Sequence, residues 1–299
     1  MSLVSFVKVE KGNDIGTAIE DSLGLIQYSL PSDAKNVVIK PNMCYYWDYS
    51  TGETTDPKFV GALIDVLRRK IASQPEITIV ESDASAMKCR HAFKMLGYEK
   101  LAEEYNARLI NLSEDKCDPI EVKVGSELFR LKIPRTIKEA DLRINVPKIK
   151  YMTREGIKIT CALKNLYGCN PHPKKSHYHS RLGETIVALN KAMRFDLCIT
   201  DGIIASGIQA RRLGLVMASR DPVAIDVAAA RIAGENPRRI RYIQLAQKEG
   251  VGSTTFTQKG APIDYFRIRY PRKDTRTRLL GKAFTLAVQT GLGKRLWLE

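Results

Sequence analysis

Short runs of β-branched and other apolar residues alternate with segments of helical periodicity along most of this chain. Strand-like runs occupy residues 36–39, 77–80 and 142–146, and a helix is predicted from Asp56-Pro57 onward. Two strands that are joined through a helix usually lie parallel in one sheet. The alternation therefore predicts an α/β fold with a mostly parallel open sheet and helices on both faces.

Two segments depart from this alternation. Residues 118–135 alternate apolar and polar side chains on either side of Gly125-Ser126-Glu127, which is typical of an antiparallel β-hairpin. Beyond residue 250 the pattern weakens into a loop rich in Gly and Thr, followed by a predicted strand at residues 265–270 and a basic amphipathic stretch. We expect an α/β domain over residues 1–250 with the hairpin inserted at about 118–135. A basic C-terminal extension over residues 251–299 would pack on that domain or on a partner.

Composition and cysteine spacing narrow the class of protein. Hydrophobic residues make up 44% of the chain and charged residues 27%, which is typical of a folded globular protein. The six cysteines are scattered without a C-x-x-C pair, so they predict free thiols and provide no iron–sulfur cluster motif. Because the sequence also contains no apolar run of membrane-spanning length and no leader-like segment at Met1, it favours a cytoplasmic protein.

Polar side chains follow five of the predicted strands at the point where each strand ends. In open parallel sheets, ligands bind in the crevice at the carboxyl ends of the strands. We therefore expect one shared cleft. The five segments are Lys40-Pro41-Asn42, Glu81-Ser82-Asp83-Ala84-Ser85, Asn145-Val146-Pro147-Lys148, Asp201-Gly202 and Ser219-Arg220-Asp221-Pro222.

Each of these segments also has a purely structural interpretation. Asp56-Pro57 and Asp221-Pro222 are typical of helix N-termini, where Asp accepts from unpaired amides and Pro suits the first turn. Asp201-Gly202 could form only a turn, and Lys40-Pro41-Asn42 could simply end a strand. The functional interpretation depends on the coincidence of all five.

The densest group of polar residues lies between residues 164 and 179. Lys164-Asn165 opens it, and three of the four histidines of the chain fall inside eight residues. On an extended loop, His177 and His179 would point the same way, so they could ligate a divalent metal or bind an oxyanion. A solvated polar loop is the competing interpretation, because an H-x-H pair without a placed carboxylate is a weak metal motif.

The residue types in the expected cleft suit a small carboxylate or phosphate, held with or without a divalent ion. We expect an enzyme that acts on such an anionic metabolite. Walker, G-x-G-x-x-G, G-x-S-x-G and H-E-x-x-H motifs are absent from the sequence, so its reaction class stays open. The expected catalytic residues are Lys164, Asp201, Asp83 and Lys148, and the expected substrate-binding residues are Lys40, Asn42, Asn145, Asn165 and Ser219.

The formal net charge of +15, much of it between Arg267 and Glu299, indicates other partners. A basic surface can bind RNA, and an aromatic cluster at residues 45–49 could stack on bases. Nucleic-acid binding or processing is therefore the first alternative. The C-terminal extension could instead contact a membrane surface or a second copy of the chain.

Several of these segments resemble the domain of unknown function family 362. The resemblance covers roughly residues 35 to 235. Many relatives carry ferredoxin-like iron–sulfur modules, so it also implies a redox function, although this sequence lacks the cysteine set and has Gly207-Ile208-Gln209 where glycine-proline is usual. We expect a stand-alone member without such modules. The matching motifs are Val37-Val38-Ile39-Lys40-Pro41-Asn42, Thr54-Thr55-Asp56-Pro57, Asn145-Val146-Pro147-Lys148, Leu163-Lys164-Asn165-Leu166-Tyr167-Gly168 and Ala218-Ser219-Arg220-Asp221-Pro222-Val223-Ala224-Ile225-Asp226.

Overall fold

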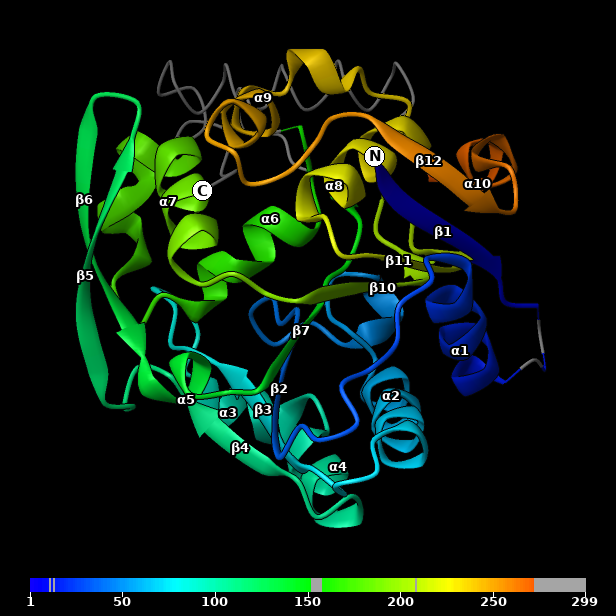
Figure 1. The fold of residues 1–299 in the computed structure, drawn as a ribbon, viewed down its shortest axis with the longest axis horizontal. Helices are drawn as coiled ribbons and strands as arrows, with labels where there is room; N and C mark the ends of the chain where they lie inside the picture. The colour runs from blue at the N-terminus through cyan, green and yellow to red at the C-terminus, as the bar shows by residue number, and fades with distance from the viewer. Residues whose placement is uncertain (11, 13, 152–157, 208, 272–299) are drawn as a thin grey trace, which may run out of the picture.

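The fold is described from a computed structural model, which covers all residues except 11, 13, 152–157, 208 and 272–299. One eight-stranded sheet runs through the molecule, with helices on both faces (Figure 1). The predicted α/β class is therefore confirmed. In spatial order the strands are β12 (Phe256–Gly260), β1 (Ser2–Lys8), β11 (Arg211–Ser219), β10 (Leu197–Ala205), β7 (Leu142–Val146), β2 (Asn36–Pro41), β3 (Glu76–Glu81) and β4 (Arg108–Asn111).

The sheet is mostly parallel, as predicted, with one reversed strand. Strands β10, β7, β2, β3 and β4 pair in parallel, and β1 pairs in parallel with β12. Strand β11 is antiparallel to both β1 and β10. Its last residue, Ser219, therefore pairs with Cys198 near the start of β10, whereas Asp201 lies farther along β10, opposite Val216.

The helices form two layers because the strands alternate buried side chains to both faces. Each layer closes its own hydrophobic core against the sheet. The first layer contains α1 (Ile15–Leu25), α2 (Pro57–Lys70), α3 (Cys89–Met95) and α4 (Tyr98–Glu104), and the second contains α6 (Ala162–Asn165), α7 (Leu182–Ala192), α8 (Pro222–Ile232), α9 (Arg241–Lys248) and α10 (Ile263–Arg269).

The predicted hairpin is present as a separate two-stranded sheet. Strands β5 (Cys117–Val124) and β6 (Glu127–Pro134) pair along their whole length, and the hairpin packs beside α7 (Figure 1). The short helix α5 (Arg135–Lys138) follows it. The remaining short elements are β8 (Lys150–Tyr151), β9 (Ile159–Thr160) and the 3-10 helices η1 (Tyr49–Thr51), η2 (Leu166–Cys169), η3 (Lys175–Arg181) and η4 (Pro237–Arg239).

Two predictions for the region beyond residue 250 are wrong. The expected loop contains the edge strand β12, and the expected strand at residues 265–270 is helix α10. Phe266 and Tyr270 are buried, whereas Ile268 between them is 78% exposed. In a strand these three side chains would all point to one face, but in a helix only residues four positions apart share a face. The basic stretch from residue 272 onward lies outside the described residues.

Candidate functional site

A buried ion pair joins the carboxyl ends of two neighbouring parallel strands. Lys40 is the last residue but one of β2, and Glu81 ends β3. The Lys40 Nζ to Glu81 Oε2 distance is 2.8 Å. The same ammonium donates to the Pro41 carbonyl oxygen at 2.6 Å. Both side chains are almost completely buried, so their charges depend on each other and on these hydrogen bonds.

Gly168 lies directly against this ion pair. A Cβ atom at this position would stand 2.6 Å from Glu81 Oε1 and 2.8 Å from Lys40 Nζ. These separations are shorter than van der Waals contact, so any side chain would push the ion pair apart. The Leu-Tyr-Gly sequence of η2 thus lets the backbone cover the two charged groups closely.

A cavity of about 210 Å³ opens beside the ion pair, between the ends of β2 and β3 and the segment from α6 to η3. Among the described residues that line it, four are lysines and one, Glu81, is a carboxylate. The cavity is therefore cationic, and its size suits a small ligand. The lysines are Lys40, Lys150, Lys164 and Lys175, and His179 also lines the cavity.

Lys175 is a buried cation of this lysine pocket. Its Nζ atom donates to Ser82 Oγ at 2.5 Å and to the Asn170 carbonyl oxygen at 2.7 Å. The Ser82 hydroxyl in turn donates to the Gly168 carbonyl oxygen. The pKa of Lys175 is lowered to about 8, chiefly by burial; the charge of Glu81 opposes the shift, and that of Lys40 adds to it.

Sequence reasoning did not assign Lys175 to the site. It noted the residue only as part of the histidine-rich segment, because nothing in the local pattern distinguishes it from Lys174, which is exposed. The Tyr167 hydroxyl donates to the Lys175 carbonyl oxygen at 2.6 Å and so helps to hold its backbone over the pocket. This contact brings together residues that the sequence offers no reason to pair.

Asn145 and Asn165 connect α6 to the sheet. The Asn165 side-chain amide donates to Asn145 Oδ1 at 2.8 Å and to the Lys40 carbonyl oxygen at 3.1 Å. Asn145 Nδ2 donates to the Ala162 carbonyl oxygen at 2.9 Å. These contacts hold α6 against the sheet, and α6 carries Lys164 to the pocket. Both amides are therefore buried residues that position the site.

Asn42 also lines the lysine pocket. Its Nδ2 atom donates to the Glu53 carbonyl oxygen at 2.6 Å, which holds the loop before α2. Tyr45, 46% exposed, lies at the same cavity, and its ring centroid is 5.5 Å from that of Trp47, which is 51% exposed. The aromatic cluster therefore borders the pocket.

Lys148 and Asp201 lie on the other face of the sheet. Asp201 and Ile199 are two positions apart on β10, so their side chains point to the same face of the sheet. Ile199 packs in the core beneath α1 to α4, whereas Lys40 faces α6. Lys148 Nζ is 3.1 Å from Asp201 Oδ2, and both side chains are buried. Asp201 also accepts from the backbone N–H groups of Asp56 at 3.0 Å and Ile203 at 3.1 Å.

Asp83 stabilises the start of α3. It accepts from the Cys89 N–H at 2.9 Å and pairs with Lys88 Nζ at 2.9 Å. Although burial raises the pKa of Asp83, these partners outweigh it and hold the pKa below its ordinary value.

The expectation that Lys40, Asp83, Lys148 and Asp201 surround one hollow is therefore wrong. Strand alternation sends the Lys40 and Asp201 side chains to opposite faces, and Asp201 forms a closed pair with Lys148.

Ser219 lies outside the lysine pocket because β11 is antiparallel to β10. Its hydroxyl donates to the Leu3 carbonyl oxygen at 2.7 Å and accepts from the Asp221 N–H at 3.1 Å. Ser219 and Asn145 line a separate, larger cavity. Asp221 and Asp56 accept from the first amides of α8 and α2, respectively, which confirms the predicted helix caps.

The two histidines do not lie on an extended loop. Residues 175–181 form η3, where side chains two positions apart point in different directions, so this part of the prediction is wrong. His177 stacks on His172 with ring centroids 5.7 Å apart, while His179 lines the lysine pocket. Within the described parts of the chain, no group of three or more His, Cys, Asp or Glu side chains could hold a metal ion.

The fold and the site together define a class: an α/β protein with a lysine-lined pocket at the carboxyl ends of parallel strands. The family model for the domain of unknown function DUF362 matches residues 37–231, which is more than half of the chain. The chain belongs to this family, as its motifs indicated. The match includes both Lys40 and the segment from Lys164 to Lys175.

Two comparisons with individual proteins extend this result. A thylakoid-associated protein of Synechocystis sp. is 31% identical over 271 residues, covering 85% of this chain and 80% of the relative. A solved structure of a protein from Thermotoga maritima has a TM-score of 0.40 and 10% identity, over 80% of this chain and 61% of that one. Within the described residues, no helix has the length and apolar character needed to cross a membrane.

Proposed function

We propose that this protein is an enzyme that acts on a small anionic metabolite, a carboxylate or a phosphate, bound in the lysine pocket. The observation that carries the proposal is the charge imbalance around the 210 Å³ cavity, where four lysines surround one carboxylate. Glu81 pairs with Lys40, and Lys150 Nζ lies 3.7 Å from Glu53 Oε2, which does not line the cavity, so lysines still outnumber carboxylates among the lining residues. An anionic ligand would balance that charge.

The contacts of each side chain suggest a division of roles. Lys164 and Lys150 line the cavity and do not belong to the Lys40–Glu81 ion pair. Both would bind the anionic group. Lys175, with a pKa of about 8, exchanges its proton near neutral pH and suits general acid–base work. Ser82 contacts the Lys175 ammonium and could relay a proton to a ligand. Lys40 and Glu81 would form the rigid floor.

A cytoplasmic location is part of the proposal. All six cysteines are unpaired, and four of them are buried, which suits a reducing compartment. The thiols form no group of ligands in the described chain, so they do not support the redox alternative. Association with thylakoids is a property of the Synechocystis relative.

RNA binding is a second candidate, and a specific observation favours it. The exposed ring of Tyr45 lines a cationic pocket, and the exposed ring of Trp47 lies beside that of Tyr45, an arrangement that can stack an unpaired base beside its phosphate. Binding of single-stranded RNA that weakens steeply with salt and requires Trp47 would support this candidate. Weak binding that does not depend on salt would remove it.

The test of the main proposal is calorimetric titration of the protein with inorganic phosphate and with succinate. Replacement of Lys164 by Ala should weaken binding of one of these probes about tenfold or more, because a charge-assisted hydrogen bond is lost. Lys94→Ala removes an exposed lysine of α3 and is the matched control. Equal affinities for the Lys164 and Lys94 variants would contradict the proposal.

A further inference from the structure

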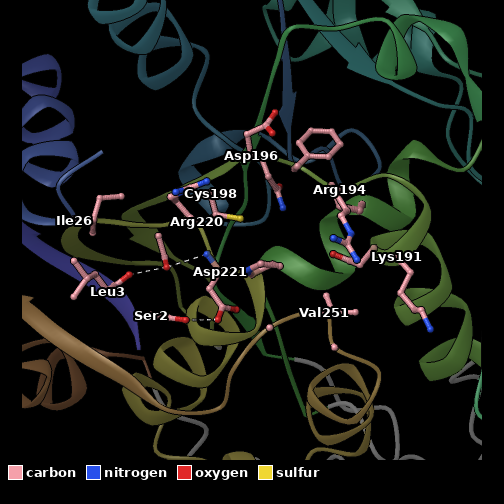
Figure 2. A pocket seen from close by; sticks show the side chains of 18 of the residues that line it. Ser2, Leu3, Ile26, Lys191, Arg194, Asp196, Cys198, Arg220, Asp221 and Val251 are labelled. Carbon is pink, nitrogen blue, oxygen red and sulfur yellow. Dashed lines mark hydrogen bonds between the residues drawn. The ribbon is translucent and has the colours of Figure 1, made fainter. Parts of the chain in front are cut away.

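A second and larger cavity, of about 590 Å³, lies between the start of β1, the end of α7 and the start of α8. Figure 2 shows Arg194 and Lys191 on one side of it and Arg220 and Asp221 on the other. Its volume falls in the range of natural small-molecule sites. Of the residues assigned to the lysine pocket, Asn145 also lines this cavity.

One buried polar atom of this cavity lacks a partner. Asn190, on α7, is 4% exposed and lines the cavity. Its Nδ2 atom donates to the carbonyl oxygens of Leu163 and Ile186, each at 2.8 Å, and these two acceptors fix the orientation of the amide. Its Oδ1 atom has no hydrogen-bond partner among the described residues. A buried acceptor of this kind is costly unless a ligand or water donates to it.

The charged groups of the cavity differ in what they already contact. Asp221 accepts from the amides of α8 and from Ser2 Oγ at 2.6 Å, so its oxygens are occupied. Lys191 pairs with Glu249 at 2.7 Å. Arg194 and Arg220 form no ion pair within the described part of the chain, although Arg220 lies over the Tyr28 ring. Two guanidinium groups are therefore available to an anion.

The walls also restrict the ligand. Leu3, Ile26, Phe195 and Val251 provide apolar surface between the polar groups. Gly252 packs so closely on the α8 cap that a Cβ atom would stand 2.0 Å from Asp221 Oδ1. Gly250 and Gly252 therefore contribute backbone to this wall of the cavity, on either side of the Val251 side chain.

We infer that this cavity is a binding site for a nucleoside monophosphate. Three features specify that class. Arg194 and Arg220 suit a phosphate, because a guanidinium group forms charge-assisted hydrogen bonds with phosphate oxygens. The apolar walls suit a flat ring, and a base or a ribose could donate an N–H or O–H to Asn190 Oδ1, which has no partner among the described residues. The site is independent of the proposed function of the lysine pocket.

The experiment is calorimetric titration of the full chain with adenosine monophosphate. Arg194→Ala and Arg220→Ala should each weaken binding about tenfold or more, because each removes a charge-assisted hydrogen bond. Arg90→Ala, an exposed arginine of α3, is the matched control and should leave binding unchanged. Asn190→Ala should also weaken binding. Because that variant also loses two internal hydrogen bonds, the arginine variants, which remove none of them, are the decisive test.

A further variant separates this site from the lysine pocket. Lys164→Ala should not change the affinity for adenosine monophosphate if the nucleotide occupies the larger cavity. Loss of binding in that variant, with full binding in the arginine variants, would overturn the inference. Absence of measurable binding to the unmodified protein would overturn it too. Equal affinity of the Lys164→Ala variant for inorganic phosphate and for adenosine monophosphate would also overturn it, since the nucleoside would then contribute nothing.

Discussion

Removal of the Lys148 charge should destabilise the protein strongly. Lys148 and Asp201 form an ion pair in which both side chains are at most 1% exposed. Loss of one partner from such a pair typically costs about 3–5 kcal/mol, because the other charge stays buried without compensation. Asp201 would keep hydrogen bonds from two backbone amides, those of Asp56 and Ile203, so we expect about 3 kcal/mol for Lys148→Met.

Urea unfolding followed by circular dichroism measures this loss. We expect Lys148→Met to lower the free energy of unfolding by about 3 kcal/mol, and the exposed control Lys94→Met to change it by less than about 0.5 kcal/mol. The double variant Lys148→Met, Asp201→Asn should be less destabilised than the sum of the single variants, by about 2 kcal/mol. Additive losses, or a Lys148→Met loss below about 1 kcal/mol, would refute the structural role of the pair.

Two further predictions concern the lysine pocket. Gly168→Ala should lower anion affinity and stability together, because the new methyl group would stand 2.6 Å from Glu81 Oε1; unchanged calorimetric and unfolding data would count against the tight packing. Sulfate affinity should be level below pH 8 and fall as pH rises through the pKa of Lys175, about 8, since the bound anion requires the protonated amine. The Lys175→Met variant should bind sulfate weakly at pH 7, and its affinity should not decline as the pH rises. A decline that persists in this variant would show that another group titrates.

The sequence was most informative where local chemistry determines local structure. Asp56-Pro57 and Asp221-Pro222 start helices as predicted, because a carboxylate before a proline satisfies the first amides of a helix in almost any context. The strand β2 was also predicted, at residues 36–39, since its apolar run is continuous. Caps and central strands depend on few distant contacts.

The parts that could not be predicted depend on long-range pairing. The face to which Asp201 points is set by the register of β10 against β7 and β11, which no local pattern contains. The same holds for the reversed direction of β11, which moves Ser219 out of the lysine pocket. The burial of Lys175 results from packing of η3 over the sheet. Side-chain type therefore indicated candidate residues, and topology decided which of them share a pocket.

The central claim, that the lysine pocket binds an anion, is tested most directly by anomalous diffraction from crystals soaked in selenate. We predict a selenium peak inside the 210 Å³ cavity, placed so that the selenate oxygens lie within hydrogen-bond distance of Lys164 or Lys175. Selenium peaks confined to other parts of the surface, with this cavity empty, would contradict it.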